Sequence, residues 1–134
     1  MAKIQKTSET TVTAMAKPNG GHTNSDAKPE IQRMYENAQW RLTKIQADPD
    51  HDKKDEDDAW EEREHAGQIY FDAKDAVFLQ NDFRIGELTQ QLKDKNRQIE
   101  QMKKDYEHIA NAMMLVSSAI VLAGRLVDIA LGRL

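Results

Sequence analysis

From Ile85 to the last residue of the chain, apolar side chains recur at alternating steps of three and four residues, and no proline interrupts them. This heptad spacing predicts a helix that packs along its length against other helices. The positions of this C-terminal seam are Ile85, Leu88, Leu92, Lys95, Ile99, Met102, Tyr106, Ile109, Met113, Val116, Ile120, Ala123, Val127, Ala130 and Leu134. One unbroken helix of this length would measure about 75 Å, whereas a compact domain of this size has a radius of gyration of about 14 Å. We therefore expect an elongated hairpin, an oligomer, or both.

The C-terminal seam has charged flanks up to His108 and uncharged flanks from Ile109 to Gly124. In the uncharged part a second apolar line runs beside the seam. Its members are Ala112, Leu115, Ala119, Leu122 and Leu126. A helix that is apolar on two faces must bury both of them, and a single partner helix covers only one. This segment therefore predicts a bundle, an assembly or a lipid surface.

Composition narrows the class of protein. The 134 residues carry a net charge of −4 and include no cysteine, which suits one small domain and excludes disulfides and thiolate sites. Nucleic-acid binders usually present a basic face, whereas the basic residues here alternate with acids, so no nucleic-acid partner is expected. The N-terminus lacks the apolar core of a secretory signal peptide. We expect a protein that is either cytoplasmic or exported without a cleaved signal.

The N-terminal part of the chain divides into a tail and a helix. Residues 1–27 are polar and rich in Ser and Thr, so a disordered tail is predicted. Pro29 and Glu30 suit the first turn of a helix, which we predict over 28–47. Its own seam comprises Ile31, Tyr35, Ala38, Leu42 and Ile45. This helix should end before Pro49, because the residue that precedes a proline avoids the helical conformation.

Beyond this helix, residues 48–57 are predicted to form an acidic loop. Asp58 and Glu61 have the spacing of a capping box, which would start a long helix over 58–134. An aromatic stripe in the first part of this helix stays in the heptad phase of the C-terminal seam, which favours one continuous helix. The helix is allowed a break near 81–86. The stripe comprises Trp60, Gly67, Phe71 and Phe78, beside a second line of Ala59, Ala66, Tyr70, Ala73 and Val77.

The predicted fold class is therefore all-α: a disordered tail, a short helix, an acidic turn and a long C-terminal coiled-coil helix, arranged as a helical hairpin that is oligomeric. The short helix covers only the first part of the long one, which leaves the apolar C-terminal half without a partner inside the chain. This shortfall predicts self-assembly. The predicted assembly interface comprises Ile99, Met102, Tyr106, Ile109, Met113, Val116, Ile120, Ala123, Val127, Ala130 and Leu134.

The acidic loop superficially resembles a calcium site. Asp48, Asp50 and Asp52 alternate like the first ligands of an EF-hand loop. The sixth position, however, is Lys53 where the turn needs glycine, and the twelfth is Ala59 where calcium needs a glutamate. We interpret the loop as a solvated acidic turn.

A second metal-like pattern is Glu62-x-x-His65, the spacing that places two ligands of a helical di-iron site on one face. The further carboxylates of such a site are not apparent, so both residues are interpreted as solvated helix surface. Nucleophile and phosphate-loop motifs are also missing from the sequence. We expect no metal, no cofactor, no catalytic residues and no enzymatic activity.

The layout of residues 29–134 resembles that of the small secreted helical subunits of type III secretion systems, the needle and filament proteins. The shared features are a polar start rich in Ser and Thr, a short helix, a proline-containing turn at 47–50 and a long C-terminal helix with an apolar end. The resemblance implies export without a cleaved signal, helical polymerisation through the C-terminal helix, and a cytoplasmic chaperone before export.

The sequence thus predicts a non-enzymatic, self-assembling coiled-coil protein, in line with an exported needle-like or filament-like subunit. One alternative is a membrane-active helical protein, a translocator or lysis-type factor, that uses residues 109–134. Its uncharged run is shorter than the roughly 20 residues that span a bilayer. Another alternative is a cytoplasmic helical adaptor or chaperone that captures a partner's amphipathic helix. The expected partners are copies of the chain or another helical protein, with membrane contact through 109–134 as the alternative.

Overall fold

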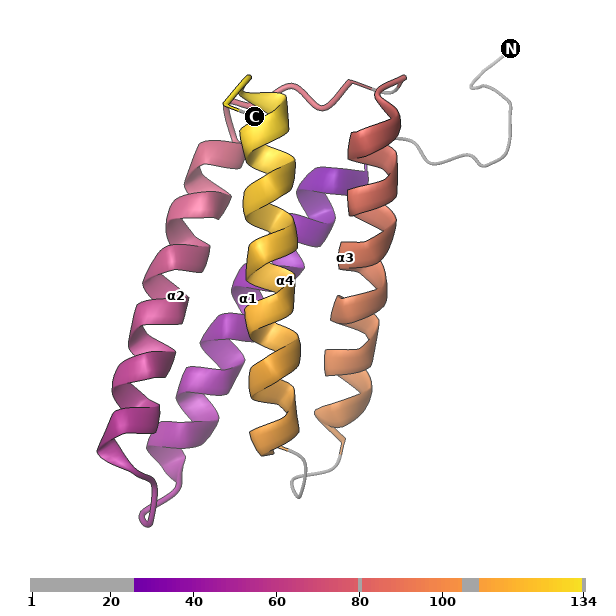
Figure 1. Cartoon of the computed structure of the whole chain (residues 1–134). Coiled ribbons are helices and arrows are strands. Elements are labelled where there is room, and N and C mark those ends of the chain that lie inside the picture. The colour runs from indigo at the N-terminus through magenta and orange to yellow at the C-terminus, as the bar shows by residue number, and fades with distance from the viewer. Residues whose placement is uncertain (1–25, 80, 105–108, 134) are drawn as a thin grey trace.

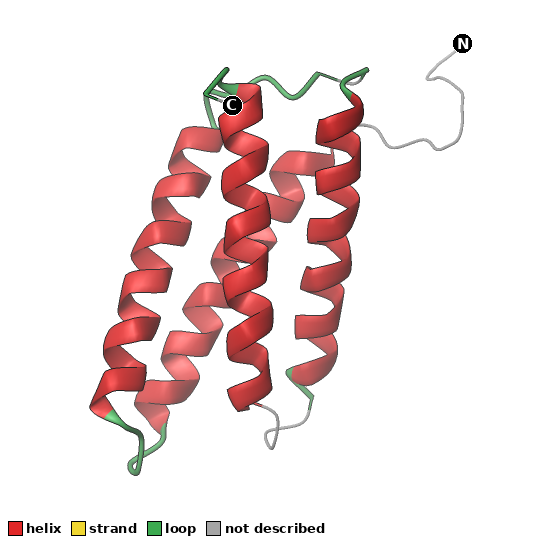
Figure 2. Cartoon of the chain, in the orientation of Figure 1, coloured by secondary structure: helices red, strands yellow, loops and turns green. Residues whose placement is uncertain are grey.

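The computed structural model describes residues 26–79, 81–104 and 109–133, with the side chains of 109–112 outside the description. These residues form α-helices and no strand (Figure 2). The helices are α1 (Ala27–Ala47), α2 (Lys53–Ala73), α3 (Phe83–Met102) and α4 (Ile109–Ala130). The predicted all-α class is confirmed. Residues 1–25 of the predicted tail lie outside the described residues.

The helices lie side by side as a bundle in which successive helices run in opposite directions (Figure 1). α1 pairs most closely with α2, and α3 pairs most closely with α4. α4 contacts all three other helices, whereas α2 and α3 barely touch and so occupy opposite corners. The connection from α2 to α3 therefore crosses one end of the bundle, which we call the crossover end. The C-terminal end of α4 lies at this end as well.

The predicted continuous helix over 58–134 is wrong, because the chain reverses direction twice within it. The first reversal separates α2 from α3, beside the break allowed near 81–86, and the second separates α3 from α4. A straight helix would leave both apolar faces of its last part in water. Folding back places those faces against three other helices, and the burial of apolar surface favours this arrangement.

Aspartates start two of the helices. The carboxylate of Asp52 accepts a hydrogen bond from the backbone N of Lys54 at 3.1 Å, and that of Asp82 accepts from the backbone N of Arg84 at 2.9 Å. Both aspartates have the extended backbone of an N-cap. α2 therefore begins more than one turn before the predicted start at Asp58, with Asp52 as its N-cap.

The end of α4 is a Schellman motif. The backbone N of Arg133 donates to the carbonyl of Asp128 at 2.6 Å, and that of Gly132 donates to the carbonyl of Ile129 at 3.1 Å. Gly132 has a φ of 75°, which a side chain would make costly. The glycine therefore stops the helix at the crossover end.

The core runs through the bundle and takes side chains from every helix. Its buried members include Ile31, Met34 and Ala38 of α1, Ala66, Ile69 and Ala73 of α2, Ile85, Leu92 and Ile99 of α3, and Val116, Ala119, Ile120, Ala123, Leu126 and Val127 of α4. Small residues let α2 approach α1 closely. A Cβ on Gly67 would lie 3.3 Å from the ring of Tyr35, which itself stacks on Tyr70 with ring centroids 5.3 Å apart.

Candidate interaction surfaces

The predicted assembly interface falls largely inside this core. Ile99, Val116, Ile120, Ala123 and Val127 are each at most 3% exposed, and they pack within the core of a single chain. Met102, Met113 and Ala130 are partly buried. Tyr106, Leu134 and the side chain of Ile109 lie outside the described residues. The C-terminal seam is therefore a surface on which the chain folds back on itself.

The expectation that the C-terminal seam lacks a partner within the chain is wrong, because the other helices of the same chain cover it. The second apolar line is covered too: Ala119, Leu122 and Leu126 are buried and Leu115 is partly buried. The face that α4 turns outward is a third line. It comprises Met114, Ser118, Val121 and Arg125, all exposed. An interface on α4 would therefore use residues other than those of the seam.

Within the described residues, one helical segment, Met113–Ala130, is long and apolar enough to cross a membrane, with a mean hydropathy of 1.8. This segment qualifies as a possible membrane span by its length and composition alone. Its apolar composition is also explained by the position of α4 in the bundle, because a helix that contacts three neighbours needs apolar residues on most of its circumference.

A buried polar layer joins α1 to α3. The Nδ2 of Asn96 lies 2.9 Å from both the main-chain O and the Oε1 of Glu30, and the Nδ2 of Asn37 donates to the Oδ1 of Asn96 at 3.3 Å. Arg33 pairs with the other carboxylate oxygen of Glu30 at 2.7 Å. Buried polar groups need such partners, and a polar layer within an apolar core can fix the register of packed helices. This layer therefore favours one alignment of α1 with α3.

A second polar cluster joins α1, α2 and α4. The guanidinium of Arg41, only 1% exposed, pairs with the carboxylate of Glu62, and the hydroxyl of Ser117 donates to the other oxygen of that carboxylate. The interpretation of Glu62 as solvated surface is therefore wrong, although His65 is exposed. Among the described residues, the Nη2 of Arg41 has no hydrogen-bond partner. The free energy cost of removing a charge from water is about as large as the free energy gained when it forms an ion pair. We therefore interpret this cluster as favouring one arrangement of the helices more than it raises the free energy of unfolding.

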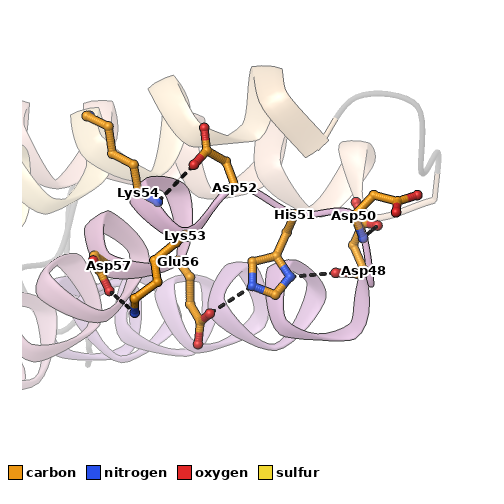
Figure 3. Close-up of polar contacts among 8 residues, drawn as sticks. All are labelled: Asp48, Asp50, His51, Asp52, Lys53, Lys54, Glu56 and Asp57. Carbon is orange, nitrogen blue, oxygen red and sulfur yellow. Dashed lines mark hydrogen bonds and ion pairs between the residues drawn. The ribbon is translucent and has the colours of Figure 1, made fainter.

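The acidic loop is shorter than the predicted 48–57, because its second half belongs to α2 (Figure 3). Its carboxylates stabilise the turn itself: the Oδ1 of Asp48 accepts from the backbone N of Asp50 at 2.9 Å, and Asp52 caps α2. Within the parts of the chain that the structure describes, no group of three or more His, Asp or Glu side chains is placed to hold a metal ion.

His51 links this loop to the first turn of α2 (Figure 3). Its Nδ1 lies 2.5 Å from the carbonyl O of Asp48, and its Nε2 lies 2.8 Å from the Oε1 of Glu56. The hydrogen bond to the Asp48 carbonyl and the pairing with Glu56 raise the pKa of His51. The same pairing lowers the pKa of Glu56. The loop therefore contains a charge-assisted clamp that favours a protonated imidazole beside an ionised carboxylate.

Large apolar side chains are exposed at the crossover end. They are Phe71 (63%), Val77 (68%), Leu79 (56%), Phe83 (78%) and Leu131 (40%). We call these residues the apolar end patch. They come from the last turn of α2, the connection that follows it, the start of α3 and the end of α4, which lie at the same end of the bundle (Figure 1). The sequence signal is the apolar run Val77-Phe78-Leu79, which is unusual for a turn and falls within the predicted helix over 58–134.

Comparison with models of known protein families, with curated proteins and with solved structures finds no match for the chain. The layout that resembled the type III needle and filament subunits depended on one long C-terminal helix. The structure has three helices in its place.

Proposed function

We propose that this chain is a non-enzymatic structural protein that assembles with copies of itself, and that the apolar end patch is its main contact. The observation that carries the proposal is the exposure of five large apolar side chains at one end of a bundle whose long apolar seam is already closed. The proposal keeps the self-assembly expected from the sequence and assigns it to a different surface.

The size of the apolar end patch fits the centre of an interface. With large side chains carrying roughly 150–250 Å² each, the exposed fractions correspond to an area on the order of 500 Å². Monomeric proteins seldom expose more than about 300–600 Å² in one patch, and such patches are often functional. A standard interface takes about 800 Å² from each partner, so a rim of polar residues would complete it.

The charges around the apolar end patch favour a protein surface as its occupant. Arg84 pairs with Asp82 at 3.0 Å, and Arg133 pairs with Asp128 at 3.0 Å. Anionic membranes attract surfaces with an excess of Lys and Arg, whereas these cations stand beside carboxylates. Charges of both signs can find their opposites across a two-fold axis, as in an interface between two copies of one surface. A second copy of this chain is therefore the occupant that we propose.

Sedimentation velocity over a range of concentrations tests this proposal. The full chain should associate at tens of micromolar, and the double variant Phe71→Ser, Phe83→Ser should associate much more weakly, because the contact at the apolar end patch is lost. Both substitutions are at exposed positions, so the helical circular dichroism should not change. The matched control is Met114→Ser, which removes a side chain that is 75% exposed but lies on the outer face of α4.

Two outcomes would overturn the proposal. The first is a chain that stays monomeric at these concentrations. The second is association that the double variant and the Met114→Ser control reduce equally. Flotation with lipid vesicles of mixed neutral and anionic lipid gives the competing answer: if the chain binds vesicles through Phe71 and Phe83 but does not self-associate, the apolar end patch is a lipid contact.

A further inference from the structure

We propose a second, lateral contact between copies of this chain, in which an acidic stripe on α2 of one copy docks into a basic groove between α3 and α4 of the next. The inference rests on the proposed self-assembly and adds the surfaces through which it would extend. It starts from two sets of charged side chains on the sides of the bundle that have no partners among the described residues.

The basic groove lies between α3 and α4. It is lined by Gln91, Lys95, Ser117, Ser118, Val121, Leu122 and Arg125. Neither Lys95 nor Arg125 makes a hydrogen bond or ion pair with any residue in the described parts of the chain. Lys95 is the one charged position of the C-terminal seam. Lys95 lines a shallow groove, so a charge at this position of the seam can serve binding at the groove in place of packing in the core.

The geometry of the two helices places both cations along the same groove. Helical side chains lean toward the N-terminus of their own helix. Figure 1 shows that α3 and α4 are antiparallel. A side chain on α3 is therefore expected to lean toward the crossover end, and one on α4 to lean away from it. Counted from that end at 1.5 Å per residue, the backbones of Lys95 and Arg125 differ in height by about 10 Å, which two long side chains can close. Val121 and Leu122 supply an apolar floor between them.

The acidic stripe lies on the outer face of α2. Glu61 and Glu64 are both exposed, and neither has a hydrogen bond or ion pair with another described residue. They are three residues apart, which places their side chains about 5–6 Å apart on one face. Trp60 stands beside them and is 42% exposed, although an aromatic ring of this size is usually covered. The guanidinium of Arg63 lies 5.7 Å from its ring centroid.

The two surfaces complement each other in charge and in apolar content. Two carboxylates and two cations, each without a partner among the described residues, would face each other, and Trp60 would cover the exposed Val121 of the groove. Within one chain the stripe is exposed on the outer face of α2, and Lys95 lies on α3 at the opposite corner of the bundle, so the two surfaces do not meet. A contact between two different surfaces is heterologous. When two copies bind in this way, one copy still has a free groove and the other a free stripe, so further copies can be added. Combined with the apolar end patch, it would generate an extended assembly.

Charge reversal tests the lateral contact. The groove variant Lys95→Glu, Arg125→Glu and the stripe variant Glu61→Lys, Glu64→Lys should each raise the dissociation constant of the lateral step roughly tenfold or more, because like charges then face each other. An equimolar mixture of the two variants should recover assembly, since the reversed groove fits the reversed stripe. The matched control is Glu36→Lys, an exposed charge reversal on α1 outside both surfaces.

Carbodiimide cross-linking of mixed isotope-labelled and unlabelled chains provides the second measurement. Links from Lys95 to Glu61 or Glu64 should join labelled to unlabelled chains. The inference is overturned if the variants assemble like the parent, if the mixture does not recover, or if no such links form between chains.

These results separate the two interfaces. Suppose that Phe71→Ser, Phe83→Ser abolishes association while both charge variants behave like the parent; the lateral contact is then wrong and the end contact stands. If instead the charge variants weaken association, their mixture restores it, and the serine variant has no effect, the lateral contact stands and the end contact is wrong.

Discussion

Asn96 of α3 lies within hydrogen-bonding distance, 2.9 Å, of both the main-chain oxygen and the side-chain Oε1 of Glu30 in α1. Asn96 is 1% exposed and Glu30 is 3% exposed. A carboxylate so deeply placed is tolerated because Asn96 and Arg33 both donate to it. The pair therefore links the start of α1 to the later turns of α3 at one register.

Replacing Asn96 with leucine should destabilise the bundle. The substitution leaves the Glu30 carboxylate with Arg33 as its one described partner, which costs roughly 1–3 kcal/mol in the free energy of unfolding. Urea unfolding followed by far-ultraviolet circular dichroism measures the loss. The control is Gln98→Leu, an exposed position on the same helix, where a change within about 0.5 kcal/mol is expected. Equal unfolding midpoints for both variants would contradict the role assigned to this layer.

The Arg41–Glu62 pair should respond unequally to removal of either partner. Glu62→Ala leaves a guanidinium that is 1% exposed without its counter-charge, at a cost of about 3–5 kcal/mol. Arg41→Met should cost less, because the Glu62 side chain is 24% exposed and can still be solvated. Urea unfolding of the two single variants measures the order. If Arg41→Met proves the more damaging, the buried charge left by Glu62→Ala is not the larger cost, and our interpretation of the cluster is wrong.

The seam shows what periodicity could and could not predict. Heptad spacing identified Ile99, Val116 and Val127 as packing positions, and all three are buried. It did not identify what they pack against, because a heptad pattern is the same whether the partner helix belongs to the same chain or to another. The phase also continues across both reversals, so the pattern itself contains no sign of them. The local signal of the first reversal is Asp82, an aspartate suited to the N-cap of a new helix that begins at Phe83.

The polar clusters and the apolar end patch depend on tertiary structure, and the sequence alone did not reveal them. Glu62 lies in a strongly charged stretch, which is typical of solvated surface, yet in the bundle it pairs with Arg41 of the neighbouring helix α1. Phe71 keeps the phase of a packing stripe but lies 63% exposed in the last turn of α2, where no neighbouring helix covers it. Sequence spacing states which residues share a face, and only the arrangement of helices decides which faces are covered.

Ile120→Asp should unfold the whole bundle. Ile120 is 3% exposed in the shared core, and an ionised carboxylate without a partner there costs several kcal/mol, a large part of the stability of a small domain. Circular dichroism should show loss of helix throughout the chain. Had the seam been an interface between chains, residues 84–108 would keep their helicity. The control Glu100→Lys breaks an exposed pair with Lys103 and should change stability by about 0–1 kcal/mol.

The clamp at His51 should make stability depend on pH. The raised pKa of His51 means that its contribution is fully present below the ordinary value of 6.5 and is lost as pH rises through the raised pKa. The lowered pKa of Glu56 means that its contribution is present above the ordinary value of 4.5 and is lost as pH falls through the lowered pKa. The clamp is therefore strongest between these two ordinary values.

Urea midpoints measured at about pH 5.5 and about pH 8.5 test this linkage. The parent chain should be more stable at the lower pH, and His51→Gln should remove most of that difference. His65, which is exposed, gives the matched control: His65→Gln should leave the difference intact. An unchanged pH dependence in His51→Gln would show that other groups produce it.

The central claim is that α4 folds back along α3 within one chain, so that the C-terminal seam is closed internally and the proposed assembly would use other surfaces. The chain has no cysteine, so spin labels can be placed at the exposed positions Glu87 and Ser118 by cysteine substitution. Double electron–electron resonance, with labelled chains diluted in unlabelled protein, then measures the distance within a chain. Packed helices lie 8–10 Å apart, so the fold predicts a label separation below about 25 Å. A continuous helix would place the two backbones about 46 Å apart, and a distance near that value would contradict the account.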